Sequence, residues 1–216
     1  MKNFELKKEI WIWLIMLLPI VYLVMVWPAL PEIVPTHFGM DGQPDDWSSK
    51  SALIYIVVGM TAGMYLLFTI IPAIDPKDRI KAMGNKYYKL KFAMMLFMSA
   101  LCFVIVRSSI TGSIGDGRIV FLIIGALFMF LGNYMQTVKP NYFIGIRTPW
   151  TLENETVWAR THKLGGRLYF VAGGLVMVLA FVLKGLMMPV FIGIIVAASV
   201  VPMVYSYVVY KQLKGR

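Results

Sequence analysis

The sequence predicts an all-α membrane protein with six transmembrane helices, both termini in the cytoplasm, and a structured cytoplasmic loop containing a short helix between spans four and five. Its 216 residues are 59% hydrophobic and 15% charged, against about 45–50% and about 25% in soluble domains. The apolar residues are concentrated in long segments, and the basic residues gather between alternate pairs of these segments. These features indicate a polytopic protein with a defined orientation.

The apolar segments have the length that a bilayer requires. A helix rising 1.5 Å per residue needs about 20 apolar residues to cross roughly 30 Å of hydrocarbon. The segments that qualify are residues 10–30, 52–74, 92–110, 119–138, 168–184 and 188–210. The first follows a basic N-terminus, as a signal peptide would, but its apolar run is longer than an h-region and no A-x-A-like site follows. We therefore expect it to remain as an uncleaved anchor.

The distribution of lysine and arginine predicts the orientation. Seventeen of the 21 basic residues lie within residues 1–9, 75–91, 139–167 and 211–216. By the positive-inside rule, both termini and the two basic loops are cytoplasmic. The net charge of +10 is then mainly an orientation signal, and direct nucleic-acid binding is not indicated.

Few residues are available for chemistry inside the predicted membrane. Cys102 is the only cysteine, which excludes an intrachain disulfide and a cysteine zinc cluster. His37 and His162 fall on opposite sides of the predicted bilayer, and all acidic residues lie in loops or at span edges. Proton- or sodium-coupled transporters usually keep an ionisable group at membrane depth. No such group is visible here, which weakens a transport function. The sequence also lacks paired intramembrane acids, a metal motif, a catalytic serine or cysteine motif and a glycine-rich phosphate loop, so we expect no metal site, no cofactor and no enzymatic activity.

One glycine pair in the second span has a spacing typical of helix contacts. Gly59 and Gly63 form a small-xxx-small pattern, which permits close approach of two helices in a membrane. A chance match in a glycine-rich chain explains the same pattern, so both interpretations stay open.

The first outer loop, residues 31–51, reads PEIVPTHFGMDGQPDDWSSKS. Its prolines, glycines and Asp-Gly pair predict an ordered connection of turns without a helix. His37, Asp41, Asp45 and Trp47 are candidate binding residues for an extracellular ligand. The His/Asp spacing fits neither an EF-hand nor a zinc motif, and Trp47 could equally anchor the loop at the outer interface.

The second inner loop carries an unusual cation. Residues 140–162 read PNYFIGIRTPWTLENETVWARTH, in which Arg147 stands among isoleucine, proline and tryptophan side chains. These neighbours predict a sheltered guanidinium that holds a phosphate or carboxylate, or that caps carbonyl groups at a helix end. A third alternative is that the whole segment only seals the cytoplasmic end of the helix bundle.

A short helix is predicted in the second half of this loop. Thr151 is a suitable N-cap, and Gly165-Gly166 supply a stop, so the helix extends over about residues 152–164. Glu155, Trp158 and His162 then share one helical face over two turns. Glu155 and His162 are too far apart along the helix for a catalytic pair, but the three side chains can present one surface.

Two stretches resemble a known family. KPNYFIGIRTPWTLENETVWARTH closely resembles the signature of the SdpI family of bacterial membrane proteins, and LPEIVPTHFGMDGQPDDWSSK resembles the small domain of unknown function that often precedes it. The resemblance divides the chain into residues 1–89, with spans one and two, and an SdpI-like part at 90–216, with the inner motif at 139–166. The positions that match the motif are Asn141, Phe143, Gly145, Arg147, Thr148, Pro149, Trp150, Thr151, Trp158 and His162.

The resemblance implies a function that does not involve catalysis. Members of this family are immunity proteins of the bacterial plasma membrane that protect a cell against a secreted antimicrobial peptide toxin. They also signal by capturing a cytosolic repressor protein. By this likeness, the outer loop would meet the peptide and Asn141, Phe143, Arg147, Thr148, Trp150, Glu155, Trp158 and His162 would form the inner binding motif. The alternative is a small-molecule or lipid-handling transporter with an anion site at Arg147.

Overall fold

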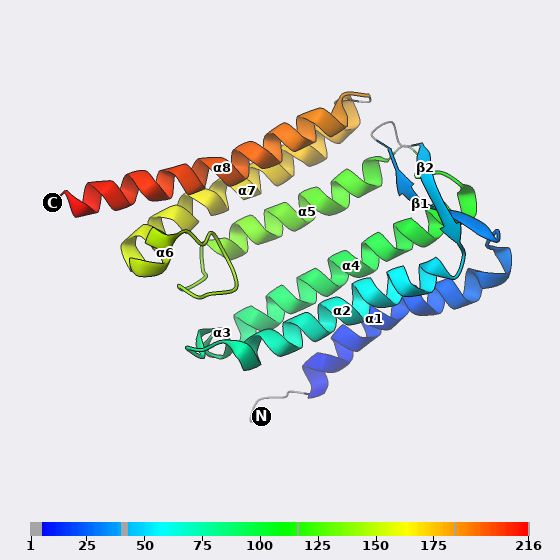
Figure 1. Ribbon diagram of the computed structural model, residues 1–216, viewed down its shortest axis with the longest axis horizontal. Helices are drawn as coiled ribbons and strands as arrows, with labels where there is room; N and C mark the ends of the chain where they lie inside the picture. Colours follow the sequence, from blue (N-terminus) through cyan, green and yellow to red (C-terminus); the bar gives the residue numbers. More distant parts are fainter. Residues whose placement is uncertain (1–5, 40–42, 116, 184, 216) are drawn as a thin grey trace. The chain divides into compact units, whose positions relative to one another are not determined.

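The protein is built mainly of long helices. The computed structural model describes residues 6–39, 43–115, 117–183 and 185–215. Within these ranges six helices are long and apolar enough to cross a membrane. They are α1 Leu6–Val26, α2 Ala52–Ile74, α4 Asn85–Thr111, α5 Arg118–Met135, α7 Glu155–Val182 and α8 Met187–Lys214 (Figure 1). The predicted multi-pass, all-helical architecture is confirmed.

The helix ends differ from the predicted spans where polar turns continue a helix. The bounds of α2 are as predicted, whereas α4 begins at Asn85 instead of residue 92 and α7 at Glu155 instead of residue 168. A hydrophobicity criterion leaves charged turns out of a predicted span. Lysine and arginine are nevertheless good helix formers, so the helix can continue through such turns into the membrane interface. Both helices therefore reach beyond their apolar segments.

Shorter elements connect the helices. Between α1 and α2 lie a 3-10 turn, Trp27–Ala29, and two antiparallel strands, β1 Ile33–Phe38 and β2 Pro44–Ser49. The described residues of this loop contain no helix, as predicted, and two strands take the place of the expected turns. The other short elements are the helices α3 Arg79–Ala82 and α6 Pro149–Glu153.

The chain forms two compact units. Unit 1 consists of residues 1–70 and 88–123, and unit 2 of residues 71–87 and 124–216. In unit 1, Leu23 of α1, Leu53 of α2 and Val106 of α4 share a buried core with Val34 of β1. The hairpin is therefore fixed to the helices by an apolar side chain from its first strand.

In unit 2, α5 and α7 approach each other through glycine. A β-carbon at Gly132 would lie 2.4 Å from the backbone nitrogen of Phe170 and 2.6 Å from the carbonyl oxygen of Gly166, and one at Gly173 would lie 2.4 Å from the carbonyl oxygen of Gly125. These contacts pair Gly132 with Gly166 and Gly125 with Gly173, so the two helices touch backbone to backbone. Such close approach is the usual basis of helix association in lipid.

Candidate functional site

Residues 136–148 of unit 2 form a loop of irregular backbone that side chains stabilise. Between α5 and α6 the chain has no helix or strand, so its carbonyl groups lack the partners that regular structure provides. Side-chain donors supply them instead. Hydrogen bonds run from Lys86 to the carbonyl of Thr137, from Trp158 to Val138, from Asn141 to Lys139 and Ile144, from Arg79 to Pro140, from Arg147 to Tyr142 and from Thr151 to Ile146.

Asn141 is the centre of this loop. It is only 1% exposed, and its Oδ1 accepts from the backbone N–H groups of Phe143 and Ile144 at 2.8 and 2.7 Å. Its Nδ2 donates to the carbonyls of Lys139 and Ile144 at 2.9 and 3.1 Å. An asparagine amide can both donate and accept, and here both functions are used on the chain itself.

His162 connects the loop to α7 in one defined tautomer. Its Nε2 accepts from the backbone N–H of Ile146 at 3.0 Å, so Nδ1 must carry the proton that it donates to the carbonyl of Trp158 at 2.9 Å. The ring is 2% exposed and stacks on Trp158 at 3.9 Å between centroids. His162 is therefore a neutral, buried link between the loop and the helix.

Gly145 makes this link possible. Its φ of +113° lies in a region that L side chains rarely adopt, and a β-carbon there would stand 2.3 Å from His162 Nε2. The position of His162 therefore requires glycine at residue 145.

The Thr148 and Thr151 side chains form a reciprocal cap on α6. Thr148 Oγ1 accepts from the N–H of Thr151, while Thr151 Oγ1 accepts from the N–H of Thr148 at 2.8 Å. Trp150 Nε1 donates to Ser206 Oγ of α8, and Thr148 Oγ1 lies 3.3 Å from the same oxygen. The cap therefore also joins the loop to α8.

The predicted short helix over residues 152–164 is wrong in its bounds. α6 ends at Glu153, and α7 begins at Glu155 with Asn154, not Thr151, as its N-cap. Asn154 Oδ1 accepts from the N–H groups of Thr156 and Val157 at 2.9 and 3.1 Å. Gly165-Gly166 do not end the helix, because their missing side chains admit neighbouring groups, among them the backbone of Gly132. The cause of the error is that glycine serves both as a helix stop and as a helix contact.

The expected shelter of Arg147 is also wrong. Its side chain is exposed, and its guanidinium donates to the carbonyl of Tyr142 in its own loop. Trp150, one of the neighbours that predicted this shelter, packs on Tyr207 of α8 instead, at 5.2 Å between ring centroids. Among the candidate residues Glu155 is exposed as well, Phe143 and Trp150 are half-buried, and Trp158 is buried. The predicted shared face of Glu155, Trp158 and His162 therefore has one exposed and two buried members.

Two buried threonines in this region allow a matched test of the hydrogen bonds. Thr151 Oγ1 accepts from Thr148 and lies 3.0 Å from the carbonyl of Ile146, whereas Thr161 Oγ1 has no partner among the described residues. Thr151→Val is expected to cost about 1–3 kcal/mol, because it leaves buried partners unsatisfied. Thr161→Val removes an unpaired hydroxyl and is expected to be neutral or stabilising. Thermal unfolding in detergent would measure both, and equal losses would contradict this assignment.

The β1–β2 hairpin in unit 1 carries most of the other candidate residues. His37 on β1 and Asp45 on β2 form an exposed pair, with Nδ1 and Oδ1 2.5 Å apart. Trp47 lies opposite Pro35 and is 53% exposed. Asp41 lies outside the described residues. Within the described ranges no group of three metal-ligating side chains occurs. The hairpin exposes the polar side chains of His37 and Asp45 together with the apolar side chains of Trp47 and Ile33.

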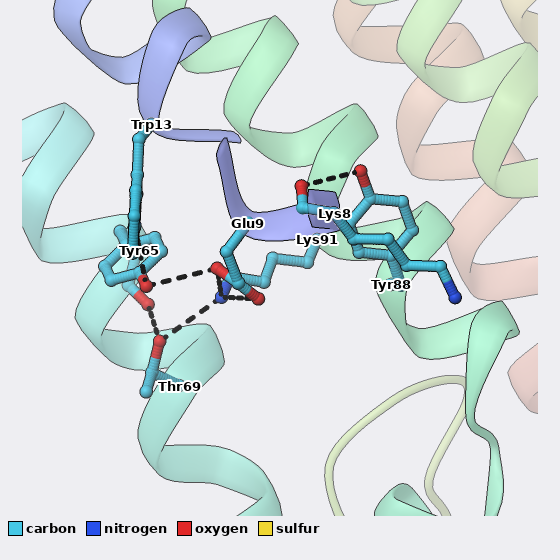
Figure 2. Close-up of polar contacts among 7 residues, drawn as sticks. All are labelled: Lys8, Glu9, Trp13, Tyr65, Thr69, Tyr88 and Lys91. Carbon is cyan, nitrogen blue, oxygen red and sulfur yellow. Dashed lines mark hydrogen bonds and ion pairs between the residues drawn. The ribbon is translucent and has the colours of Figure 1, made fainter. Parts of the chain in front are cut away.

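A second polar site in unit 1 was not predicted. Glu9 of α1 and Lys91 of α4 form an ion pair whose side chains are 14% and 7% exposed. Lys91 Nζ donates to both carboxylate oxygens at 3.0 and 2.9 Å and lies 3.4 Å from Thr69 Oγ1 (Figure 2). Glu9 stands in the first turn of its span, as expected for an acid at a span edge, but it is enclosed by three helices instead of solvated.

Aromatic side chains complete this site. Tyr65 Oη of α2 donates to Glu9 Oε2 at 3.1 Å and accepts from Trp13 Nε1 at 2.9 Å. Lys91 Nζ also lies 4.1 Å from the centre of the Tyr65 ring (Figure 2), a cation–π distance. No local sequence pattern indicates this arrangement, since 82 residues separate Glu9 from Lys91.

Comparison with known proteins finds two family matches and one similar protein that extends over almost the whole chain. Residues 137–206 match the SdpI/YfhL protein family, and residues 14–62 match a domain of unknown function, DUF1648. The chain is 29% identical over 214 residues to "Immunity protein SdpI" of Bacillus subtilis (strain 168), which covers 97% of this chain and 99% of that protein. No solved structure matches. The chain is thus a multi-pass membrane protein that carries an SdpI-family region at residues 137–206, preceded by the domain of unknown function at residues 14–62.

Proposed function

We propose that this protein is a non-enzymatic integral protein of the bacterial plasma membrane that confers immunity to a secreted antimicrobial peptide. The observation that carries the proposal is the likeness to an immunity protein over 97% of the chain. The likeness therefore extends over the six long helices and the hairpin as well as the inner motif. In this proposal the termini and the inner loop face the cytoplasm, as the basic residues predict.

The hairpin is the surface that we assign to the peptide. It is anchored by the buried Val34, while His37, Asp45 and Trp47 remain exposed. A large exposed aromatic side chain on a rigid hairpin suits contact with an amphipathic peptide, because aromatic residues contribute most to binding at interfaces. The buried inner-motif residues would then position the loop, and exposed Arg147 and Glu155 would meet a cytosolic repressor.

Survival of cells tests the proposal. A strain from which the gene is deleted should be killed by culture supernatant of the parent strain, and the gene should restore survival. Trp47→Ala should lose at least tenfold in surviving cells, whereas Trp11→Ala, which also removes an exposed tryptophan, should not. If the deletion strain survives as well as its parent, the immunity role is refuted.

The inner loop has a separate test. Arg147→Ala and Glu155→Ala are expected to leave survival unchanged and to reduce recruitment of a fluorescently labelled repressor to the membrane. The transporter alternative requires Arg147 to bind an anion, but the guanidinium of Arg147 already donates to the carbonyl of Tyr142. We therefore prefer the immunity function.

A further inference from the structure

A cavity of about 440 Å³ lies in unit 1 where α4 ends and α5 begins. Phe103, Val104 and Arg107 line it from α4, and Ile119 lines it from α5. This is the end of unit 1 that carries the hairpin, since Val106 of α4 and Val34 of β1 belong to one buried cluster. No predicted function uses this cavity.

Arg107 is the charged residue among the described residues that line the cavity. It is exposed, and its guanidinium makes no hydrogen bond or ion pair with any residue that the structure describes. A guanidinium offers five N–H donors in a planar fork that matches the oxygens of a phosphate. An arginine without a protein partner in a concave site is therefore prepared for an anion.

The hydroxyl groups around Arg107 are mostly committed. Ser108 donates to the carbonyl of Val104 at 2.8 Å, and Thr111 lies 2.8 Å from the carbonyl of Ser113. Ser113 Oγ accepts from the N–H of Gly115 at 3.0 Å and keeps its own proton for another acceptor. Among the described side chains that line the cavity, Arg107 and Ser113 thus keep donors for a ligand, which favours a ligand with an acceptor group.

The lining changes from apolar to polar along α4. Phe103 and Val104 precede Arg107 by about one turn, which places them roughly 5–6 Å deeper in the span, whereas Thr111 and Ser113 lie towards its end. A ligand that matches this gradient has an anionic group beside an apolar chain. In a membrane, the phosphate of a phospholipid lies at this level of a spanning helix, above its acyl chains.

We propose that this cavity binds one phospholipid molecule, with its phosphate held by Arg107 and Ser113 and its first methylene groups against Phe103, Val104 and Ile119. The site differs from the hairpin surface and does not depend on the immunity function. A lipid bound there would fill the junction of α4 and α5 beside the hairpin.

Native mass spectrometry of the full-length protein in detergent tests the proposal, with dihexanoyl-phosphatidylglycerol as the probe. Arg107→Gln removes the guanidinium that would bind the phosphate. Val104→Trp fills the apolar part of the cavity and leaves the charge of Arg107 in place. Each is expected to weaken retention of one lipid at least tenfold. Arg160→Gln, which removes an exposed arginine on α7, is the matched control and should retain the lipid.

Three outcomes would overturn the proposal. The first is unchanged retention by Arg107→Gln, and the second is a loss in Arg107→Gln without a loss in Val104→Trp, which would show surface electrostatics instead of a cavity. The third is displacement of the lipid by an equimolar amphipathic peptide with a free carboxylate, which would assign the site to a peptide. Melting temperatures verify folding, and Val104→Phe replaces Val104→Trp if the larger side chain unfolds the protein.

Discussion

Replacing Glu9 with methionine is expected to destabilise the protein by about 3–5 kcal/mol, because it leaves the Lys91 ammonium buried without a counter-charge. Lys91→Met should cost a similar amount for the opposite reason. The double variant Glu9→Met/Lys91→Met should be more stable than either single variant, since no charge then remains in the enclosed site. Thermal unfolding of the purified protein in detergent measures the three differences.

An exposed ion pair provides the control. Lys81 and Asp78 are also in contact, at 2.5 Å, but their side chains are 57% and 70% exposed. Lys81→Met is expected to change stability by less than about 1 kcal/mol. If the double variant at positions 9 and 91 loses the sum of the two single losses, the ion pair does not act as one unit.

Gly132→Val is expected to destabilise unit 2 by about 3 kcal/mol or more, because the new side chain would meet the backbone of α7 and not a flexible side chain. For a chain of this size, that loss corresponds to a fall in melting temperature of roughly 6–12 °C. Gly63→Val is the matched control, since a β-carbon at Gly63 has nothing within 4 Å. Similar losses at both positions would refute the backbone contact between α5 and α7.

The spans could be predicted because the bilayer imposes one simple requirement, a long apolar helix. The same simplicity explains the errors at the ends. The turn that contains Lys89 and Lys91 continues α4, and the polar turns after Glu155 continue α7, although neither satisfies the hydropathy criterion. Helix propensity and membrane depth are separate properties, and hydropathy reports only depth.

The spacing of the glycines is a sequence signal for the helix contacts. Gly59 and Gly63 have the familiar spacing, yet both face open space within the chain. The glycines that bring helices together are Gly125, Gly132, Gly166 and Gly173, with a spacing of seven residues in each helix. Paired glycines at a heptad spacing in two successive spans are a recognisable pattern. The pairing of Glu9 with Lys91, in contrast, depends on packing that no local pattern encodes.

The inner motif was located correctly, but the roles of its residues could not be read from their neighbours. Asn141, Thr148 and His162 are buried with their polar atoms on the protein's own backbone, whereas Arg147 is exposed. A sequence shows that polar residues recur in an apolar segment. It does not show that the irregular backbone itself creates the demand for their hydrogen bonds.

The division of the chain into two interleaved units has a consequence for synthesis on the ribosome. Residues 71–87 belong to unit 2 but precede the last part of unit 1, which ends at residue 123. Arg79 must wait for the carbonyl of Pro140, 61 residues later, an interval of roughly 3–12 s at about 5–20 residues per second. Unit 1 can therefore complete its core while residues 71–87 are still without their partners, so the order of synthesis favours completion of unit 1 before unit 2.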